Sequence, residues 1–436
     1  MKTAAVIAEW NPFHNGHAYF LSEVRKRSGA DYILAVMSGD FVQRGAPAIV
    51  DKYKRTKMAL DGGADLVIEL PVAAATGSAG EFAAGAVSVL ERTGVVDELW
   101  FGSECGAIHP FLQLADILAE EPDSFRTRLQ EAAARGLSFP AARADAARAV
   151  LKKRQERTAG DIPADSAEAA GFDPEQLLSQ PNNILGLAYC IELKKRGSRI
   201  RPYTVRREGA GYHARDKSDC ALYPSAEAIR RMLLHPGEIP EHPEPETAGE
   251  TGRSVSRGLL EHAMPEDAAA VMAEAEKQNC LMDIDDFSDM LYYRLLQECP
   301  ASMLRYYGMS ESLANRILSQ MVHCKTVSSL AQAIKAKHLT RSGIDRILLR
   351  ILLGIDQDAV RQACECPILR VLGFRNCDPL LHILHENAAV PYEMRVSAIP
   401  AEQYKSDLFA SHLYEWVRAK KSGGLYYSEY KRMVVK

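Results

Sequence analysis

The sequence lacks a membrane-spanning segment and a signal peptide. No apolar run reaches the length needed to cross a bilayer, and the N-terminal residues lead directly into a strand-like segment. Both absences predict a cytoplasmic protein that does not associate with membranes.

The sequence also lacks a cysteine framework and an excess of basic residues. Its nine cysteines are an odd number without regular spacing, and the closest pair, Cys364 and Cys366, is too tight for a usual zinc half-site. We therefore expect reduced cytosolic thiols. The 53 Lys and Arg residues are balanced by 57 Asp and Glu residues, which gives a formal net charge of −4. A nucleic acid would have to be bound by a local basic patch.

The remaining composition is ordinary for a globular protein, with 47% hydrophobic and 25% charged residues. A length of 436 residues suggests two or three domains. In the first hundred residues, apolar runs at 4–9, 32–37, 65–70 and 98–101 alternate with helical patterns at 16–27, 51–61 and 81–92. This alternation predicts a parallel sheet of the Rossmann-like α/β type, covered by helices on both faces.

The rest of the chain is predominantly helical in pattern. Residues 110–180 predict a helical elaboration, and a helix at 184–196 with a strand at 200–205 completes the sheet. Residues 236–256 are rich in Pro, Glu, Gly and Thr, which predicts a loop or linker. Helical spacing returns at 281–297, 310–322, 328–336 and 342–353. We thus predict a Rossmann-like domain over 1–235, a linker over 236–256 and a mainly α-helical domain over 257–436.

A His-x-Gly-His motif follows the first predicted strand. Pro12 ends that strand, Asn15 can cap the next helix, and Gly16 removes a side chain where a ligand would approach. His14 and His17 can then face one point above the helix N-terminus, where free N–H groups and the helix dipole favour a phosphate. Two imidazoles there could stabilise charge on an α-phosphate as pyrophosphate leaves.

Two other interpretations of the motif exist. The histidines could be a helix cap and a core residue. They could also bind zinc, but a third ligand is needed and Glu9 is the only acid close by. The position directly after an N-terminal apolar strand favours nucleotidyl transfer, and we predict no metal-ligand set.

A longer pattern extends along the chain. It comprises residues 8–17 (AEWNPFHNGH), 37–45 (MSGDFVQRG), 69–71 (ELP), 101–104 (FGSE), 181–186 (PNNILG), Arg207 with 209–213 (GAGYH), and 225–230 (SAEAIR). Together these segments resemble the bacterial tRNA(Met) cytidine acetate ligase family, part of the nucleotidyltransferase superfamily related to class I aminoacyl-tRNA synthetases. The resemblance covers nearly the whole chain.

The resemblance implies an ATP-dependent ligase. Such an enzyme forms acetyl-adenylate from ATP and acetate and passes the acetyl group to the wobble cytidine of elongator tRNA(Met). The product is N(4)-acetylcytidine, with AMP and pyrophosphate released. Adenylyl transfer from ATP ordinarily also needs Mg²⁺ on the phosphates. No obligate protein partner is evident.

The resemblance also implies site residues. The catalytic residues are His14 and His17. The ATP-binding residues are Ile7, Ala8, Glu9, Asn11, Pro12, Phe13, His14, Gly16, His17, Phe20, Gly102, Asn182, Arg207 and Arg230.

Physical reasons support the later members of this set. A side chain at Gly102 would obstruct a nucleotide, the Asn182 amide can both donate and accept, and Arg207 can hold phosphate oxygens. Their other interpretations are a turn glycine, a helix N-cap and a solvated charge. Arg230 ends a segment that resembles a triphosphate-binding signature, but Glu227 stands where Ser or Thr is usual. A carboxylate beside a triphosphate is repulsive, so either Glu227 points away or the segment is only a capped helix start.

Two further sets of residues are predicted to contact substrates. The loop after the second strand holds Asp40, Gln43 and Arg44, which we expect to face a substrate, although it could be an ordinary polar loop. A basic stretch, expected to contact tRNA phosphates unless it is a solvated helix face, contains Lys335, Lys337, Arg341, Arg346 and Arg350. Near the C-terminus, Tyr426, Tyr427 and Tyr430 could stack on a base, but we expect them to pack instead.

Two other functions share parts of this pattern. A small-molecule adenylyltransferase would carry the same motif, but such enzymes are usually a single Rossmann-like domain. A non-catalytic RNA-binding protein could retain a degenerate fold, but the two intact histidines and the glycine argue against decay.

Overall fold

A computed structural model gives the structure of the protein and describes residues 1–158, 172–207, 225–235, 260, 262–336, 339–432 and 434–435. The chain divides into two compact units, Met1–Val95 with Glu208–Lys436, and Val96–Arg207. The predicted linker at 236–256 lies outside the described residues. The predicted domain boundaries therefore stay a prediction, and the structure groups the chain at other positions.

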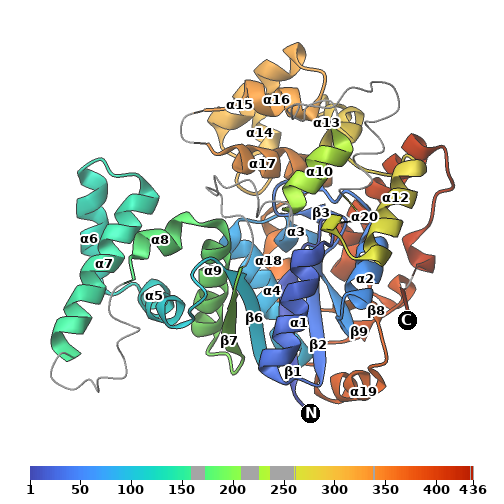
Figure 1. The fold of residues 1–436 in the computed structure, drawn as a ribbon. Coiled ribbons are helices and arrows are strands. Elements are labelled where there is room, and N and C mark those ends of the chain that lie inside the picture. Colours follow the sequence, from blue (N-terminus) through green and yellow to red (C-terminus); the bar gives the residue numbers. More distant parts are fainter. Residues whose placement is uncertain are drawn as a thin grey trace, which may run out of the picture. The chain divides into compact units, whose positions relative to one another are not determined.

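A mainly parallel sheet forms the centre of the first unit (Figure 1), with its strands in the order β10-β8-β5-β2-β1 and β9 beside β8. All neighbours are parallel except β5 and β8, which are antiparallel. The strands are β1 (Thr3–Ala8), β2 (Tyr32–Ser38), β5 (Leu66–Leu70), β8 (Leu369–Phe374), β9 (Tyr392–Glu393) and β10 (Val434–Val435). Strands β2 and β5 are buried almost throughout, as expected for parallel strands covered on both faces.

Helices cover this sheet. Helices α1 (Asn15–Ser28) and α2 (Lys52–Asp61) follow β1 and β2 and lie on one face, whereas α4 (Ala79–Thr93) lies on the other (Figure 1). Right-handed crossovers place α1 and α2 on the same face because each connects one strand to the next in the same direction along the sheet. The two-residue strands β3 (Phe41–Val42) and β4 (Ala46–Pro47) form a small hairpin after β2.

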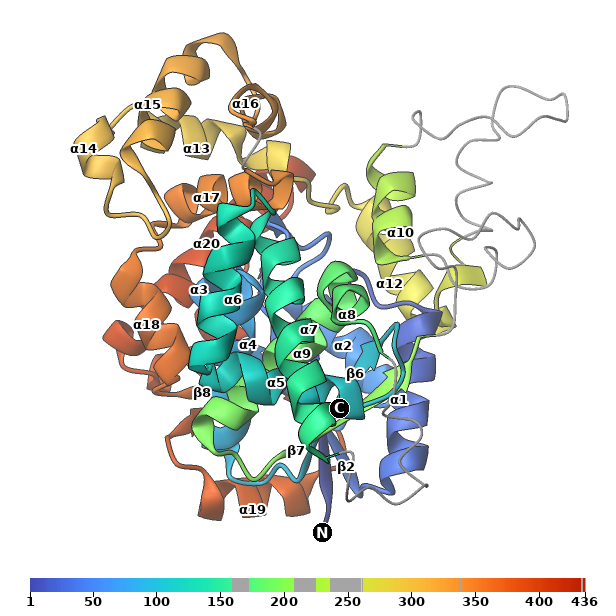
Figure 2. The same ribbon diagram turned by 90° about the vertical axis from the view of Figure 1, so that its left-hand side faces the viewer.

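The C-terminal half of the first unit is mainly helical. In Figure 2 the helices α13 to α17 gather at one end of this unit. The helices not yet introduced are α3 (Val72–Ala75), α10 (Ala226–Leu234), α12 (Glu266–Lys277), α13 (Ser288–Leu295), α14 (Pro300–Met303), α15 (Glu311–Gln320), α16 (Val327–Ala333), α17 (Arg341–Leu353), α18 (Gln357–Glu365), α19 (Asp378–Asn387) and α20 (Ala401–Ser422). Short 3₁₀ turns are η3 (Ile284–Phe287), η4 (Met321–His323), η5 (Val396–Ala398) and η6 (Glu429–Lys431).

The second unit contains two parallel strands and five helices among its described residues. Strand β6 (Glu98–Ser103) pairs with β7 (Arg201–Arg206) in register from Glu98 opposite Arg201 to Ser103 opposite Arg206. The helices are α5 (His109–Glu120), α6 (Asp123–Ala134), α7 (Phe139–Thr158), α8 (Pro174–Ser179) and α9 (Pro181–Arg196). Helices α5 to α8 occupy the segment where a helical elaboration is predicted, and α9 and β7 lie where the following helix and strand are predicted.

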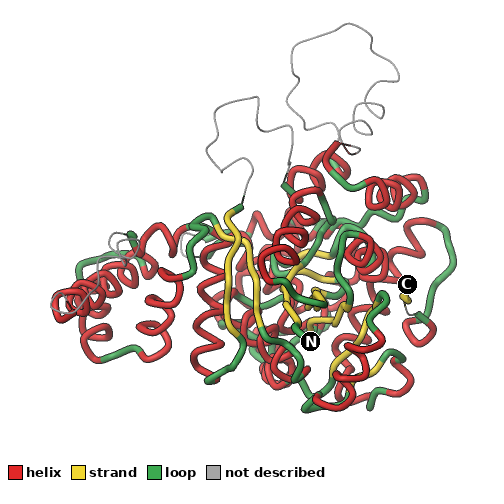
Figure 3. Tube along the Cα trace, turned by 60° about the horizontal axis from the view of Figure 1, so that its bottom comes forward, coloured by secondary structure: helices red, strands yellow, loops and turns green. Residues whose placement is uncertain are grey.

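The predicted α/β class is confirmed, and Figure 3 shows the strands flanked by helices. The sequence pattern did not predict β8, which the C-terminal half contributes to the sheet. Within the described residues, no helix is both long and apolar enough to span a membrane. None of the eight described cysteines takes part in a disulfide bond.

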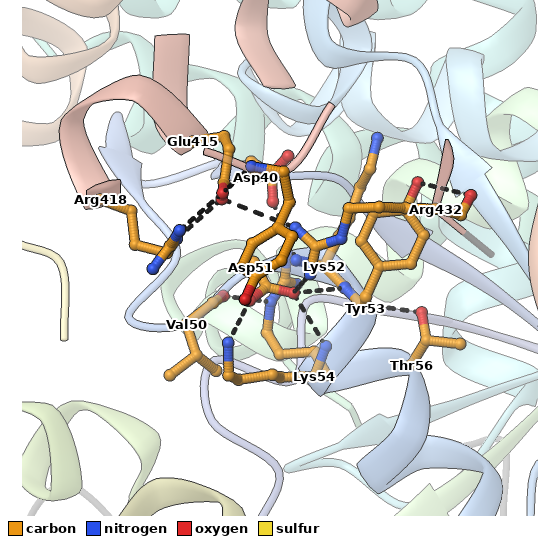
Figure 4. Close-up of polar contacts among 12 residues, drawn as sticks. Asp40, Val50, Asp51, Lys52, Tyr53, Lys54, Thr56, Glu415, Arg418 and Arg432 are labelled. Atoms are coloured by element: carbon orange, nitrogen blue, oxygen red, sulfur yellow. Dashed lines mark hydrogen bonds and ion pairs between the residues drawn. The ribbon is translucent and has the colours of Figure 1, made fainter. Parts of the chain in front are cut away.

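A buried ionic network joins the start of α2 to the C-terminal segment. The Lys52 ammonium is fully buried and lies 2.8 Å from carboxylate oxygens of both Glu69 and Glu429. Next to it, Asp51 caps α2 and forms an ion pair with Arg432 at 3.2 Å (Figure 4). Opposite charges and hydrogen bonds offset the cost of burying these groups. The network thus anchors the start of α2, and with it the loop that precedes this helix, to β5 and the C-terminal segment.

A buried carboxyl on α20 makes the stability depend on pH. Asp407 accepts a 2.6 Å hydrogen bond from the Val72 N–H, and burial, together with the nearby Glu69, raises the pKa of Asp407 to about 7. The folded-state pKa thus lies above the unfolded value of about 4. The stabilising contribution is complete below pH of about 4 and is lost as the pH rises through about 7.

We therefore expect Asp407→Asn to flatten the pH dependence of stability. Asparagine retains an oxygen for the Val72 N–H but carries no titratable proton. Urea unfolding at pH 5 and pH 8 should show a larger loss of stability toward pH 8 in the wild type than in the variant. Equal losses in the two proteins would show that Asp407 does not control this dependence.

Candidate active site

The two histidines of the motif lie against each other at the start of α1. His14 is the N-cap residue, and its Nδ1 accepts a 3.1 Å hydrogen bond from the Gly16 N–H. The Nδ1 of His17 accepts a 3.2 Å hydrogen bond from the His14 N–H. The rings are stacked with centroids 3.7 Å apart. Because each Nδ1 accepts, each neutral ring carries its proton on Nε2. The turn therefore presents two imidazole donors at a helix N-terminus.

Two details of this turn differ from the expectation. The cap is His14 and not Asn15, whose amide instead donates a 2.7 Å hydrogen bond to the His262 carbonyl. A Cβ at Gly16 would lie 2.9 Å from the His14 Cε1. Glycine is thus required for the His14 ring to fold over the helix start, whether or not a ligand is bound.

An apolar base supports the histidines. Phe13 is fully buried, and its ring centroid lies 5.6 Å from the ring of Trp10 and 5.6 Å from that of His17. Of the predicted ATP-binding residues here, the partly exposed ones are Ile7, Ala8, Glu9, Gly16, His17 and Phe20, and the buried ones are Asn11, Pro12, Phe13 and His14. The Asn11 side chain accepts a 2.8 Å hydrogen bond from the Ile49 N–H, which holds the turn on the core.

The predicted second signature lies beside this turn. Arg230 on α10 donates a 2.5 Å hydrogen bond to the Asn11 carbonyl. Burial and the nearby Arg44 lower the pKa of Arg230, while Glu9 and Glu227 act in the opposite direction. Ser225 caps α10, and the exposed Glu227 pairs with the exposed Arg44. The segment is a capped helix start, Glu227 pairs with Arg44, and Arg230 contacts the histidine turn, so a triphosphate contact of Arg230 stays a prediction.

Two residues of the predicted substrate loop make hydrogen bonds that fix neighbouring elements. Asp40 is buried and accepts a 2.8 Å hydrogen bond from the Lys52 N–H, and burial raises the pKa of Asp40. Asp40 thus fixes the start of α2, and its predicted contact with a substrate stays a prediction. The Gln43 N–H donates a 2.7 Å hydrogen bond to the Glu9 carboxylate, which ties this loop to the end of β1.

One buried cation, Arg55, was not predicted. Its guanidinium donates to the Glu9 carbonyl at 2.7 Å, to the Ser38 carbonyl at 3.0 Å and to the Gly39 carbonyl. It therefore fixes the chain where β1 and β2 end, although burial lowers the pKa of Arg55. The sequence gives no signal for this role, because Arg55 is one of several basic residues in the first turns of α2.

In the second unit, the three predicted ATP-binding residues form one cluster. Arg207 donates a 3.3 Å hydrogen bond to the Asn182 side-chain oxygen Oδ1, and the Asn182 side-chain amide donates a 2.6 Å hydrogen bond to the Glu104 carboxylate. A Cβ at Gly102 would lie 3.3 Å from the Arg207 Cγ, so glycine leaves space for the arginine. The N-cap interpretation of Asn182 is wrong, because α9 has Gln180 as its N-cap and no side-chain cap. Glu104, which joins the cluster, was not predicted as a site residue.

The basic stretch has exposed and buried members. Lys335 and Arg341 are exposed, and Arg341 pairs with Asp345 at 2.8 Å, whereas Lys337 lies outside the described residues. Arg346 is half-buried, and burial and the nearby Arg350 lower the pKa of Arg346.

Among the described members of this stretch, Arg350 is the buried one. Its side chain is 7% exposed, pairs with Glu81 at 3.3 Å and donates to the Tyr307 carbonyl at 3.2 Å. These contacts hold α17 to α4. Arg350 is therefore a packing residue here and not an exposed phosphate contact, because the Glu81 carboxylate already neutralises the charge of its guanidinium.

The comparisons with known proteins agree along almost the whole chain. The model of the HIGH nucleotidyl transferase family matches residues 1–426. The tRNA(Met) cytidine acetate ligase of Thermoanaerobacter sp. (strain X514) is 34% identical over 420 residues, 95% of each chain. That of Acetivibrio thermocellus is 35% identical over 403 residues, 91% of this chain and 89% of the relative.

Solved structures show the same likeness. The crystal structure of Thermotoga maritima TmcAL bound with alpha-thio ATP has a TM-score of 0.78 and 30% identity, and covers 96% of this chain and 95% of the other. The apo form of the same protein has a TM-score of 0.82 and 29% identity, and covers 100% and 99% of the two chains.

Proposed function

The chain belongs to the HIGH nucleotidyl transferase family and, within it, to the tRNA(Met) cytidine acetate ligases, and we propose that it activates acetate with ATP and acetylates the wobble cytidine of elongator tRNA(Met). It acts in the cytoplasm, where tRNA is used, and needs no obligate protein partner. The observation that carries the proposal is the pair of stacked imidazoles at the N-terminus of α1.

The first half-reaction follows from this pair. An acetate oxygen attacks the α-phosphorus, the bond from that phosphorus to the pyrophosphate oxygen breaks, and acetyl-adenylate and pyrophosphate result. Negative charge grows on the phosphate oxygens during this step. The Nε2–H groups of His14 and His17 and the helix N-terminus are fixed donors that can stabilise it without reorganising. Arg230 lies beside the turn and supplies a cation for the leaving pyrophosphate.

Mg²⁺ enters this proposal with the nucleotide. Among the described residues, no group of three His, Cys, Asp or Glu side chains is placed to hold a metal ion. The only acid in the motif, Glu9, already accepts the Gln43 N–H. The ion would therefore be held chiefly by ATP phosphates, where it neutralises charge.

In the second half-reaction the cytidine amine attacks the acetyl carbonyl, loses a proton and displaces AMP. Its lone pair is delocalised into the ring, so the amine needs an activated acyl group. An anticodon loop can present the base unstacked at low cost. The ATP contacts of Gly102, Asn182 and Arg207, the substrate role of Arg44 and the phosphate contacts of Lys335, Arg341 and Arg346 belong to this proposal.

Isotope-labelled acetate tests the reaction. If acetate attacks the α-phosphorus, one oxygen-18 from labelled acetate must appear in AMP after acetyl transfer to tRNA, and pyrophosphate must be the other product. Mass spectrometry of the nucleotides measures both. ADP and phosphate as products would indicate an acyl-phosphate route and would overturn the proposal. A small-molecule adenylyltransferase or a non-catalytic RNA-binding protein would release no pyrophosphate in response to acetate.

A further inference from the structure

Aromatic side chains gather on the exposed side of α20 and on the segment after it. We define the aromatic surface as Phe409, His412, Trp416, Tyr426 and Tyr430. The first three stand at positions i, i+3 and i+7 of α20 and so share one helix face. The His412 ring lies 6.2 Å from that of Tyr426 and 5.9 Å from that of Tyr430, which joins the two segments.

These rings are not packed away. The exposed fractions are 42% for Phe409, 56% for Trp416, 42% for Tyr426 and 48% for Tyr430. The expectation that the C-terminal tyrosines pack is therefore met only in part, because each contacts a neighbouring side chain but remains about half exposed. Trp416 is also unlike the other two tryptophans, since Trp10 and Trp100 are buried. A group of large aromatic rings exposed to solvent indicates a binding surface, whereas single exposed hydrophobic residues do not.

The backbone beneath the aromatic surface is rigidly held. Arg418 forms two hydrogen bonds of 2.8 and 2.7 Å with Glu415, which also accepts the Tyr427 N–H at 2.7 Å (Figure 4 shows Glu415 and Arg418). Arg418 also donates to the Leu425 carbonyl. Glu429 accepts a 2.7 Å hydrogen bond from the Tyr53 hydroxyl in the core. Tyr426 and Tyr430 thus stand on fixed backbone, so little entropy is lost when a flat partner stacks on them.

Exposed lysines stand near the aromatic surface in the sequence. Lys405 and Lys420 are exposed near the two ends of the α20 stripe, and Lys431 is exposed next to Tyr430. Lys420 has only a long 3.5 Å contact with the exposed Asp289. Interleaved aromatic rings and cations are the two requirements of single-stranded nucleic acid, because bases stack on the rings and phosphates pair with the cations. An apolar protein partner would gain nothing from these exposed lysines.

We propose that the aromatic surface binds an unpaired stretch of the RNA substrate, with bases stacked on Trp416 and Tyr430 and phosphates near the lysines. The inference rests on the proposed function for the identity of the RNA. It adds to that function a stacking surface in the C-terminal half, separate from the basic stretch around Arg341.

Paired substitutions test this proposal. The double variant Trp416→Leu and Tyr430→Leu keeps apolar bulk and removes both flat rings, whereas Trp416→Phe with Tyr430→Phe keeps two flat rings. Each stacked base contributes about 1–3 kcal/mol. Because the leucine variant loses two stacked bases, we expect its Kd for tRNA, measured by filter binding without ATP, to rise at least about 30-fold, whereas the Kd of the phenylalanine variant should change less than about twofold. Acetate-dependent pyrophosphate release without tRNA should be unchanged in both.

Three results would overturn the stacking surface. The first is a leucine variant that binds tRNA as tightly as the wild type. The second is an equal loss of tRNA affinity in the leucine and phenylalanine variants. The third is a leucine variant that binds tRNA normally but changes its oligomeric state in sedimentation. The last would make the surface an interface between copies of this chain. A protein that binds tRNA through these rings yet releases no pyrophosphate with acetate would contradict the proposed function and leave the surface intact.

Fluorescence gives an independent readout. Since Trp416 is the exposed tryptophan, a stacking base should quench its emission when tRNA or a single-stranded oligonucleotide is added. Trp416→Phe should abolish the quenching while tRNA still binds. Quenching of the same size in that variant would contradict stacking on Trp416.

Discussion

His14→Asn and His17→Asn should each reduce acetate-dependent pyrophosphate release by about 10²- to 10³-fold, the usual cost of removing one fixed donor to a developing oxyanion. Asparagine is chosen because its side-chain oxygen can replace the Nδ1 acceptor that each histidine offers to the turn. Asparagine is also among the preferred N-cap residues. The variants therefore lose the Nε2–H donor and keep the hydrogen bonds of the turn.

Stability measurements and a matched histidine separate catalysis from folding. Urea unfolding should show each variant within about 1 kcal/mol of the wild type, the usual scale of an N-cap change. His382 on α19 is exposed and only pairs with Glu386 at 3.6 Å, so His382→Asn should retain full activity. Unchanged turnover in a folded His14 or His17 variant would remove that histidine from the mechanism.

Lys52→Met should have the largest effect on stability, about 3–5 kcal/mol, the usual cost of removing one partner from a buried ion pair. The fully buried ammonium faces Glu69 and Glu429 and donates a 2.8 Å hydrogen bond to the Ser411 hydroxyl. Burial alone would lower the pKa of Lys52, but the negative charges of Glu429 and Glu69 outweigh burial and raise this pKa well above its usual value. Methionine fills a similar volume and leaves both carboxylates facing an uncharged side chain.

Lys57→Met is the matched control, because it makes the same chemical change on the same helix. Lys57 pairs with Asp61 at 2.9 Å, and its side chain is about half exposed. An exposed pair contributes at most about 1 kcal/mol. Urea unfolding followed by circular dichroism gives both values. Similar losses for the two variants would show that the network around Lys52 does not stabilise the fold as the buried geometry implies.

The sequence predicted the elements around the histidines well, because the signals there are local. Apolar runs and helix ends within residues 1–93 coincide with β1, α1, β2, α2, β5 and α4 to within a few residues. The stacking of His14 on His17 follows from their spacing at a helix start. These features depend on residues only a few positions apart.

Contacts between distant residues could not be predicted in the same way. Lys52 meets Tyr404, Ser411 and Glu429 across more than 350 positions, and no pattern near Lys52 marks it as buried. Strand β8 lies between helical segments, so its apolar residues fit a helical continuation as well as a strand. The exposure of Tyr426 and Tyr430 likewise depends on how the C-terminal segment folds back on α20.

The position of β8 has a consequence for how the protein is made. Strands β1, β2 and β5 leave the ribosome early, but the edge of β5 is paired by β8, whose residues are Leu369–Phe374. Until those residues have been synthesised, the nascent chain carries an unpaired strand edge that is apolar except for Glu69, of the kind that recruits other chains. Proteins that end before β8, through a premature stop or proteolysis, keep that edge permanently. They should accumulate in aggregates or be held by chaperones, even though the histidine motif itself is intact.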